Sequence, residues 1–120
     1  MKRREIVDTA RGWLGTPYRH QAATLGAGCD CRGLLRGVWR QRYGDEPMEV
    51  PNYRADGRDV RHAEGLRHAA ETLLARADEL QAGQVVLFRL GRTTAPRHCG
   101  ILVAADRFIH AQEGLGVIEA

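Results

Sequence analysis

The sequence contains no long hydrophobic run. None of its apolar stretches approaches the roughly 18 residues that a membrane-spanning helix needs, so we expect no transmembrane helix. The chain begins with charged residues, but no apolar core of the kind found in secretory signal peptides follows them. We therefore expect a protein that is made in the cytoplasm without a signal peptide and that needs another route to any substrate outside it.

Cysteine is scarce and odd in number, which argues against a disulfide framework. The three cysteines are Cys29, Cys31 and Cys99, and the first two are too close in sequence to be bridged easily. We interpret all three as free thiols. Internal repeats and low-complexity segments are also lacking. The 120 residues are therefore expected to form a single domain, residues 1–120, with a modest core of its own.

A surface of one charge sign is not predicted either. The formal net charge is +3, and nearly all of the positive charge comes from arginine. The arginines are interleaved with acidic residues, as in Arg61, Glu64, Arg67 and Glu71. This pattern is typical of solvated helix faces rather than of a nucleic-acid interface, so we expect no nucleic-acid partner.

Apolar residues recur at helical spacing in the first part of the chain and give way to β-forming runs in the last part. The patterns predict helices over residues 3–14, 30–43 and 59–77 and strands over residues 84–90, 98–104, 107–111 and 117–118. Gly44 is placed to end the second helix, and residues 18–28 and 45–57 are expected to be irregular. Helices followed by an antiparallel sheet indicate the α+β class.

Cys31 has the most informative setting in the chain. It follows Gly28-Cys29-Asp30 and precedes the apolar positions of the second predicted helix. Its thiol is therefore expected in the first helical turn, with Asp30 as the N-cap. Backbone N–H groups and the positive end of the helix dipole favour a thiolate there. Because a thiolate is a nucleophile, this position indicates cysteine-dependent hydrolysis.

His98 and His110 lie on two consecutive predicted strands, and the connection between the strands decides whether they can share a site. Side chains alternate faces along a strand. A two-residue turn after Ala104 would pair Ile101 with His110 and put the histidines on opposite faces. A three-residue connection or a bulge pairs Gly100 with His110 and brings both histidines to one face. A shared site therefore predicts an odd connection or a bulge.

These residues can be combined in one catalytic arrangement. We expect His98 to be the base that activates Cys31, and His110 to orient His98 by accepting its second N–H. A backbone N–H at the start of the helix would stabilise the oxyanion of the reaction intermediate. The hydroxyl of Tyr18, in the preceding loop, would add a second donor.

A zinc site is the main chemical alternative, because Cys29, Cys31, His98 and Cys99 are residue types that bind zinc. The spacing does not favour it. One residue separates Cys29 from Cys31, whereas paired cysteines in zinc sites are usually separated by about two residues. The neighbouring residues His98 and Cys99 point to opposite faces of a strand. No metal and no other cofactor is therefore implied.

Five blocks of the sequence resemble the NlpC/P60 family of cell-wall peptidases, and they occur in the family's order. The blocks are Leu14-Gly15-Thr16-Pro17-Tyr18, Asp30-Cys31-x-Gly33-Leu34, Leu80-Gln81-Ala82-Gly83-Gln84-Val85-Val86-Leu87-Phe88, His98-x-Gly100-Ile101 and Phe108-Ile109-His110-Ala111. Together they span most of the chain, from Leu14 to Ala111. The loop that begins with Tyr18-Arg19-His20-Gln21-Ala22 is most similar to the phage and gene-transfer-agent branch of the family.

The resemblance implies a papain-like α+β fold and a cysteine peptidase that cuts the peptide stems of bacterial peptidoglycan. It matches Cys31 to the nucleophile, His98 to the base and His110 to the third polar residue. It matches Tyr18 to a tyrosine that lines the site, and Asp30 to an acidic residue that helps to read the free amine of the substrate. In a phage-like particle, such an enzyme would travel with tail or baseplate proteins and open the wall locally for DNA entry.

The sequence departs from the family pattern in two places. Arg32 stands in the substrate-binding position where many relatives have a serine, and a cation there would repel an ammonium group. The chain also ends at Ala120, where relatives usually continue with one or two strands. We expect either a truncated domain or a sheet edge that another protein covers. The alternative function is a non-catalytic structural or docking module of a tail or baseplate, and the scaffold would also suit an acyl- or amidotransferase.

Overall fold

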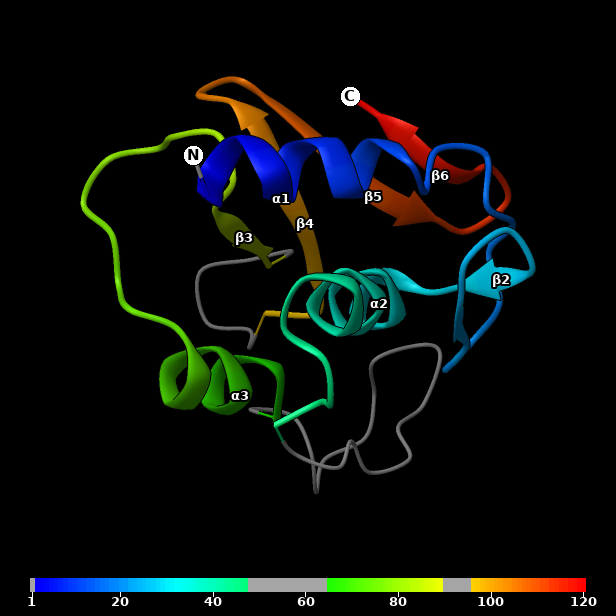
Figure 1. Ribbon diagram of the computed structural model, residues 1–120, viewed down its shortest axis with the longest axis horizontal. Helices are drawn as coiled ribbons and strands as arrows, with labels where there is room; N and C mark the ends of the chain where they lie inside the picture. The colour runs from blue at the N-terminus through cyan, green and yellow to red at the C-terminus, as the bar shows by residue number, and fades with distance from the viewer. Residues whose placement is uncertain (1, 48–64, 90–95) are drawn as a thin grey trace.

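The computed structural model describes residues 2–47, 65–89 and 96–120 (Figure 1). Its elements are α1 (Lys2–Arg11), β1 (Ala23–Thr24), β2 (Gly28–Cys29), α2 (Cys31–Tyr43), α3 (Gly65–Leu73), β3 (Val85–Phe88), β4 (His98–Ala104), β5 (Arg107–Gln112) and β6 (Gly116–Glu119). The three helices come before the main sheet in the sequence, and all strand pairs of that sheet are antiparallel. The predicted α+β class is therefore confirmed.

The main sheet has the strand order β3-β4-β5-β6, so strands that follow one another in sequence are also neighbours in space. In Figure 1, α1 crosses in front of β4 and β5, and α2 is seen along its axis below α1. The short strands β1 and β2 form a separate hairpin directly before α2. This arrangement brings the start of α2 close to the main sheet and to the hairpin.

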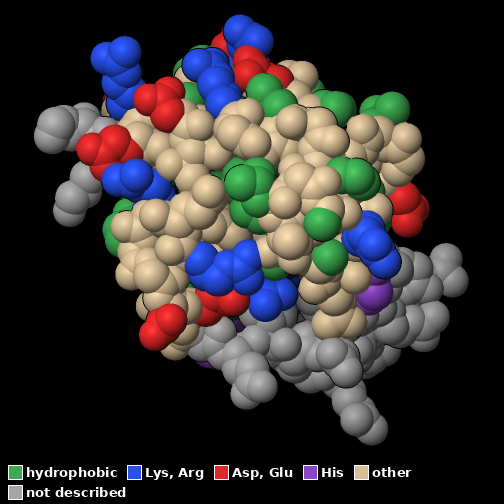
Figure 2. Space-filling model, turned by 45° about the vertical axis from the view of Figure 1, so that its right-hand side comes forward, with side chains coloured by type: hydrophobic (Ala, Val, Ile, Leu, Met, Phe, Trp, Pro, Cys, Tyr) green, Lys and Arg blue, Asp and Glu red, His purple; other side chains and the backbone are tan. Residues whose placement is uncertain are grey.

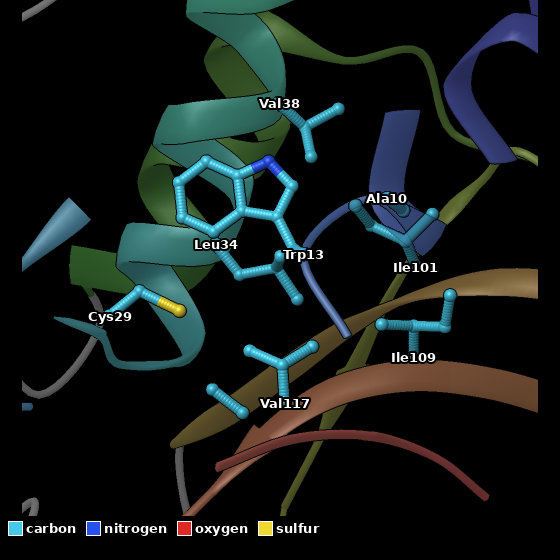
Figure 3. Close-up of a cluster of buried hydrophobic side chains, with 9 residues drawn as sticks. Ala10, Trp13, Cys29, Leu34, Val38, Ile101, Ile109 and Val117 are labelled. Carbon is cyan, nitrogen blue, oxygen red and sulfur yellow. The ribbon is translucent and has the colours of Figure 1, made fainter. Parts of the chain in front are cut away.

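One face of the sheet packs against α1, α2 and the turn that follows α1. The buried cluster contains Ala10, Trp13, Cys29, Leu34, Val38, Ile101, Ile109, Ala111 and Val117 (Figure 3). Burial of this apolar surface is the main favourable contribution to folding. Because Leu34 and Val38 belong to α2, the same packing fixes the position of that helix on the sheet.

The two ends of α2 are those that the sequence predicts. Asp30 is the N-cap, with an extended backbone and a side-chain Oδ1 that accepts a 2.8 Å hydrogen bond from the Gly33 N–H. Gly44 follows the last helical residue with a φ of 90°, a conformation that glycine adopts without steric cost. Cys31 is therefore the first residue of the helix.

Two predictions for the first third of the chain are wrong. The first helix ends at Arg11 rather than at residue 14, because the chain continues in tight turns in which the Trp13 N–H bonds to the Ala10 carbonyl. Residues 18–28, expected to be irregular, include β1 and β2. The hairpin they form is too short to show a period-two hydrophobic pattern, which is why the sequence did not reveal it.

The third helix is shorter than predicted at its C-terminus. It ends at Leu73 rather than at residue 77, and Leu66 is its buried residue. A helix that contacts the core through one turn gains little from packing, and packing is what stabilises short helices. The predictions for residues 48–57, for the helix over 59–64 and for the strand end at residue 90 lie outside the described residues.

The last strand is paired on both sides near its start. On one side β6 pairs with β5. On the other side, the Val117 N–H donates to the Thr16 carbonyl at 2.9 Å, and the Gly15 N–H donates to the Val117 carbonyl at 3.0 Å. The expectation of an uncovered edge is therefore wrong at this position, because residues before β1 fold back and occupy it.

Charged side chains of both signs are mixed over the surface, as the sequence predicts. Figure 2 shows Lys and Arg side chains beside Asp and Glu side chains on one face. Ion pairs account for part of this mixing, for example Arg11 with Glu119 at 3.5 Å and Arg36 with Glu46 at 2.6 Å. Both pairs are reached by solvent, and ion pairs of this kind contribute little to stability, typically about 0–1 kcal/mol each. Among the described residues, no helix is long and apolar enough to span a membrane.

Candidate active site

Cys31 lies at the junction of α2 and β4. Its side chain is 8% exposed and packs in a second buried cluster with Leu66 and Cys99. The pKa of the Cys31 thiol is lowered to about 5, first by a hydrogen bond from Cys99 and then by a hydrogen bond and the charge of His98, which together outweigh burial. The position in the first turn of α2 favours the thiolate further. A group of this kind is a nucleophile at neutral pH.

His98 and His110 share one face of the sheet, because the connection between β4 and β5 contains the predicted irregularity. Ile101 pairs with Ile109, and the register then shifts between Leu102 and Ala104 before β5 begins. His98 Nε2 lies 2.6 Å from His110 Nδ1. The predicted bulge and the predicted proximity of the two histidines are both confirmed.

The two imidazoles have different tasks in this geometry. The pKa of His110 is lowered by burial and by the charge of His98, which keeps His110 neutral. A neutral His110 can accept the Nε2–H of His98 at its Nδ1, and this leaves the Nδ1 of His98 for Cys31. This geometry suits the predicted roles of His98 as the base and His110 as its orienting partner, and those roles stay predictions.

Two phenylalanine rings flank the histidine pair, and sequence reasoning missed them. The Phe88 ring centroid is 5.7 Å from that of His98, and the Phe108 centroid is 4.8 Å from that of His110. The two phenylalanines also contact each other at 4.9 Å. Strand alternation could have found Phe108, which lies two residues before His110 on the same face.

Tyr18 lies close enough to Cys31 to be affected by its charge. The pKa of its phenol is raised to about 12, first by burial and then by the nearby charges of Asp30, Cys31 and Glu113. The hydroxyl therefore stays protonated at neutral pH and can donate a hydrogen bond. Half-buried and next to Cys31, Tyr18 has the position expected of a residue that lines the site; its contact with a substrate stays a prediction.

Asp30 has a structural task that the sequence only partly showed. It is 1% exposed, and besides the Gly33 N–H it accepts the Gln21 N–H at 2.7 Å. Its carboxylate therefore ties the loop after Tyr18 to the first turn of α2. Binding of a substrate amine by Asp30 stays a prediction, as does the effect of Arg32, a half-buried residue of the same turn.

The described residues contain no group of three or more His, Cys, Asp or Glu side chains that could hold a metal ion. The three cysteines among the four residues that suggested zinc are divided between two buried clusters. Cys29 belongs to the buried cluster under the sheet, whereas Cys31 and Cys99 belong to the cluster with Leu66.

The three thiols are expected to react with iodoacetamide at very different rates, because only a thiolate is alkylated. The Cys31 rate should rise through pH 5 and level off near pH 7, since its thiolate is the form present above a pKa of about 5. Burial and the charges of Asp30 and Cys31 raise the pKa of Cys29 to about 12, and the pKa of Cys99 is also raised. Mass spectrometry of the modified peptides measures all three rates.

Urea-unfolded protein is the control, because the three thiols should then react alike. A Cys31 rate that keeps rising about tenfold per pH unit between pH 6 and pH 8 would contradict a lowered pKa.

Replacing His110 with alanine is expected to lower kcat by about 10²-fold, because the Nε2–H of His98 loses its acceptor and the ring its orientation. His110→Gln should retain most of the activity, since an amide oxygen can accept the same N–H. Steady-state kinetics on a stem peptide, with circular dichroism to confirm folding, measure the effect. Equal losses in both variants would show that the acceptor is not what matters.

The cysteine that opens α2 and the histidine pair on β4 and β5 lie together in an α+β domain. The chain belongs to the NlpC/P60 family, whose model matches residues 15–120. A structural comparison agrees: the NlpC/P60 domain of the peptidoglycan hydrolase SagA superposes with a TM-score of 0.69 at 22% identity, over 98% of this chain and 87% of that chain. At this level of identity the superposition establishes the fold.

Similar sequences are bacterial peptidases. The murein DD-endopeptidase/murein LD-carboxypeptidase MepS of Escherichia coli K12 is 30% identical over 94% of this chain and 51% of its own length. The probable endopeptidase NlpC of the same strain is 29% identical over 96% of this chain and 65% of its own length. The γ-DL-glutamyl hydrolase of Bacillus subtilis 168 is 30% identical over 88% of this chain and 22% of its own length. The chain thus spans about half the length of MepS.

Proposed function

We propose that this protein is a cysteine peptidase that hydrolyses the peptide stems of bacterial peptidoglycan. The observation that carries the proposal is the contact of the Cys31 thiol with His98, whose Nε2 lies 2.6 Å from His110 Nδ1. The names of similar proteins, a murein endopeptidase and a peptidoglycan hydrolase among them, support this substrate class.

In the reaction, the Cys31 thiolate attacks a carbonyl carbon of the stem, and the oxyanion forms at the start of α2. The Gly33 N–H is already bonded to Asp30, which makes the Cys31 N–H the candidate donor, with the Tyr18 hydroxyl as a second one. Protonated His98 gives its proton to the leaving amine. Water then attacks the thioester with His98 as the base, which releases the acid and restores Cys31.

The test is digestion of purified peptidoglycan with the wild-type protein and with Cys31→Ala, followed by mass spectrometry of the released fragments. Fragments from the wild type alone are expected, and their masses identify the bond that is cut. If neither folded protein releases fragments, the peptidase proposal fails. The docking module, which Arg32 in the substrate-binding position favours, is then the better explanation.

We also propose that the protein acts within a phage-tail-like or gene-transfer-agent particle. The similarity of the loop over residues 18–22 to that branch supports this setting. Particles purified from the producing cells should contain the chain, detectable by mass spectrometry together with tail and baseplate proteins. Recovery of the chain from the cell envelope, but not from particles, would contradict the proposal.

A further inference from the structure

The Cys99 thiol packs against Cys31, and neither the proposed reaction nor the family pattern uses it. It lies on β4 directly after His98, is 0% exposed, and packs against Cys31 and Leu66. Strand alternation puts Cys99 and Ile101 on the face that packs against α2, whereas His98 and His110 lie on the other face. His98 and Cys99, whose side chains leave opposite faces of β4, therefore both contact the sulfur of Cys31.

The two thiols differ in their protonation state at neutral pH. Cys31 opens α2, where helix amides favour a thiolate, and it also contacts His98. Cys99 is fully enclosed, and the pKa of its thiol is raised well above the usual value by its hydrogen bond to Cys31 and by burial. At neutral pH the pair therefore consists of a thiolate on α2 and an S–H on β4. An S–H is a weak donor, but a charged acceptor strengthens its hydrogen bond.

We propose that Cys99 is a positioning residue of the active site, donating its S–H to the Cys31 thiolate and so fixing the position of that sulfur beside His98. The proposal rests on Cys31 as the nucleophile of the proposed function. It assigns separate tasks to two adjacent residues of β4: His98 moves the proton of the reaction, and Cys99 keeps its own.

A second role follows from the same contact. When His98 protonates the leaving amine, the Cys31 sulfur is bonded to the acyl group and is not a thiolate. The Cys99 donor takes no part in that proton transfer and stays in place until the thioester is hydrolysed. The thiolate regenerated at the end of each cycle therefore keeps one hydrogen bond.

Two substitutions separate donation from packing. Cys99→Val keeps an apolar side chain of similar size in the cluster with Leu66 but has no donor, whereas Cys99→Ser keeps a donor. The pH midpoint of Cys31 alkylation should rise by about one unit in Cys99→Val, equivalent to an alkylation rate about tenfold lower below the midpoint. In Cys99→Ser it should stay near that of the wild type.

Ile101→Val is the matched control, because Ile101 is 2% exposed on the same face of β4 and lies in the other cluster. It should leave the midpoint unchanged. The other titratable and charged groups that act on the thiol pair are unaltered in all three variants: His98, Asp30, Tyr18, Cys29 and Arg32. Shifts between variants therefore report on Cys99.

An unchanged midpoint in Cys99→Val, or equal midpoints in Cys99→Val and Cys99→Ser, would overturn the proposal. A wild-type midpoint near that of an ordinary thiol would overturn it as well. Because alkylation needs no substrate, the result is independent of peptidoglycan digestion. If the midpoints shift as expected and no fragments are released, the peptidase proposal fails and the hydrogen bond from Cys99 to Cys31 stands.

Discussion

Replacing His98 with alanine is expected to lower kcat/KM for a stem peptide by at least about 10³-fold, because the substitution removes both the proton donor to the leaving amine and a partner of the Cys31 thiolate. The fold should survive, since His98 is the first residue of β4 and is only half-buried. Initial rates with a synthetic stem peptide, and the melting temperature of each protein, are the measurements.

His68→Ala is the control for this experiment. His68 is an exposed histidine on α3, so its removal should change neither rate nor stability. Iodoacetamide adds a second readout, because the pH midpoint for Cys31 should rise in His98→Ala and not in the control. A His98→Ala protein that hydrolyses the peptide at the wild-type rate would exclude His98 as the base.

The parts of this site that the sequence predicted are those set by local rules. Asp30 and Gly44 mark the ends of α2 because capping depends on a few neighbouring residues. The bulge before β5 followed from strand alternation, given that His98 and His110 share a site. Both inferences needed only the chain on either side of each residue.

The parts that the sequence did not predict depend on which elements meet in space. The contact of Cys99 with Cys31 exists because β4 lies under the start of α2, and no local pattern encodes that meeting. The pairing of Gly15 and Thr16 with β6 is likewise a contact between the two ends of the chain. Such long-range contacts are also what position the candidate site.

Trp13→Ala is expected to lower the free energy of unfolding by about 3–5 kcal/mol, the usual cost of truncating a large buried aromatic side chain. Trp13 is 1% exposed at the centre of the main buried cluster, between α1, α2 and the sheet (Figure 3). Its Nε1–H also donates to the Gln41 side chain at 2.7 Å. Urea denaturation gives the value. Trp39→Ala, which truncates a half-buried tryptophan of α2, is the matched control and should cost clearly less.

The same side chain explains a glycine in α2. A Cβ at Gly37 would lie 2.1 Å from atoms of the Trp13 ring, so Gly37→Ala should destabilise the protein by about 1–3 kcal/mol even though alanine is the better helix former. In a Trp13→Ala background the clash is gone, and the same substitution should be neutral or stabilising. Additive effects of the two changes would show that the ring does not rest on Gly37.

This pair of residues also connects stability to catalysis. The Trp13 ring sets how closely α2 approaches the turn after α1, and Cys31 lies six residues before Gly37 on the same helix. A helix that is pushed away at Gly37 carries its N-terminus with it, and the Cys31 thiol then moves relative to β4. Gly37→Ala should therefore raise the pH midpoint of Cys31 alkylation. The double substitution Trp13→Ala/Gly37→Ala should bring the midpoint part of the way back to the wild-type value. An unchanged midpoint in a destabilised Gly37→Ala protein would mean that Cys99 and His98 follow the helix when it moves.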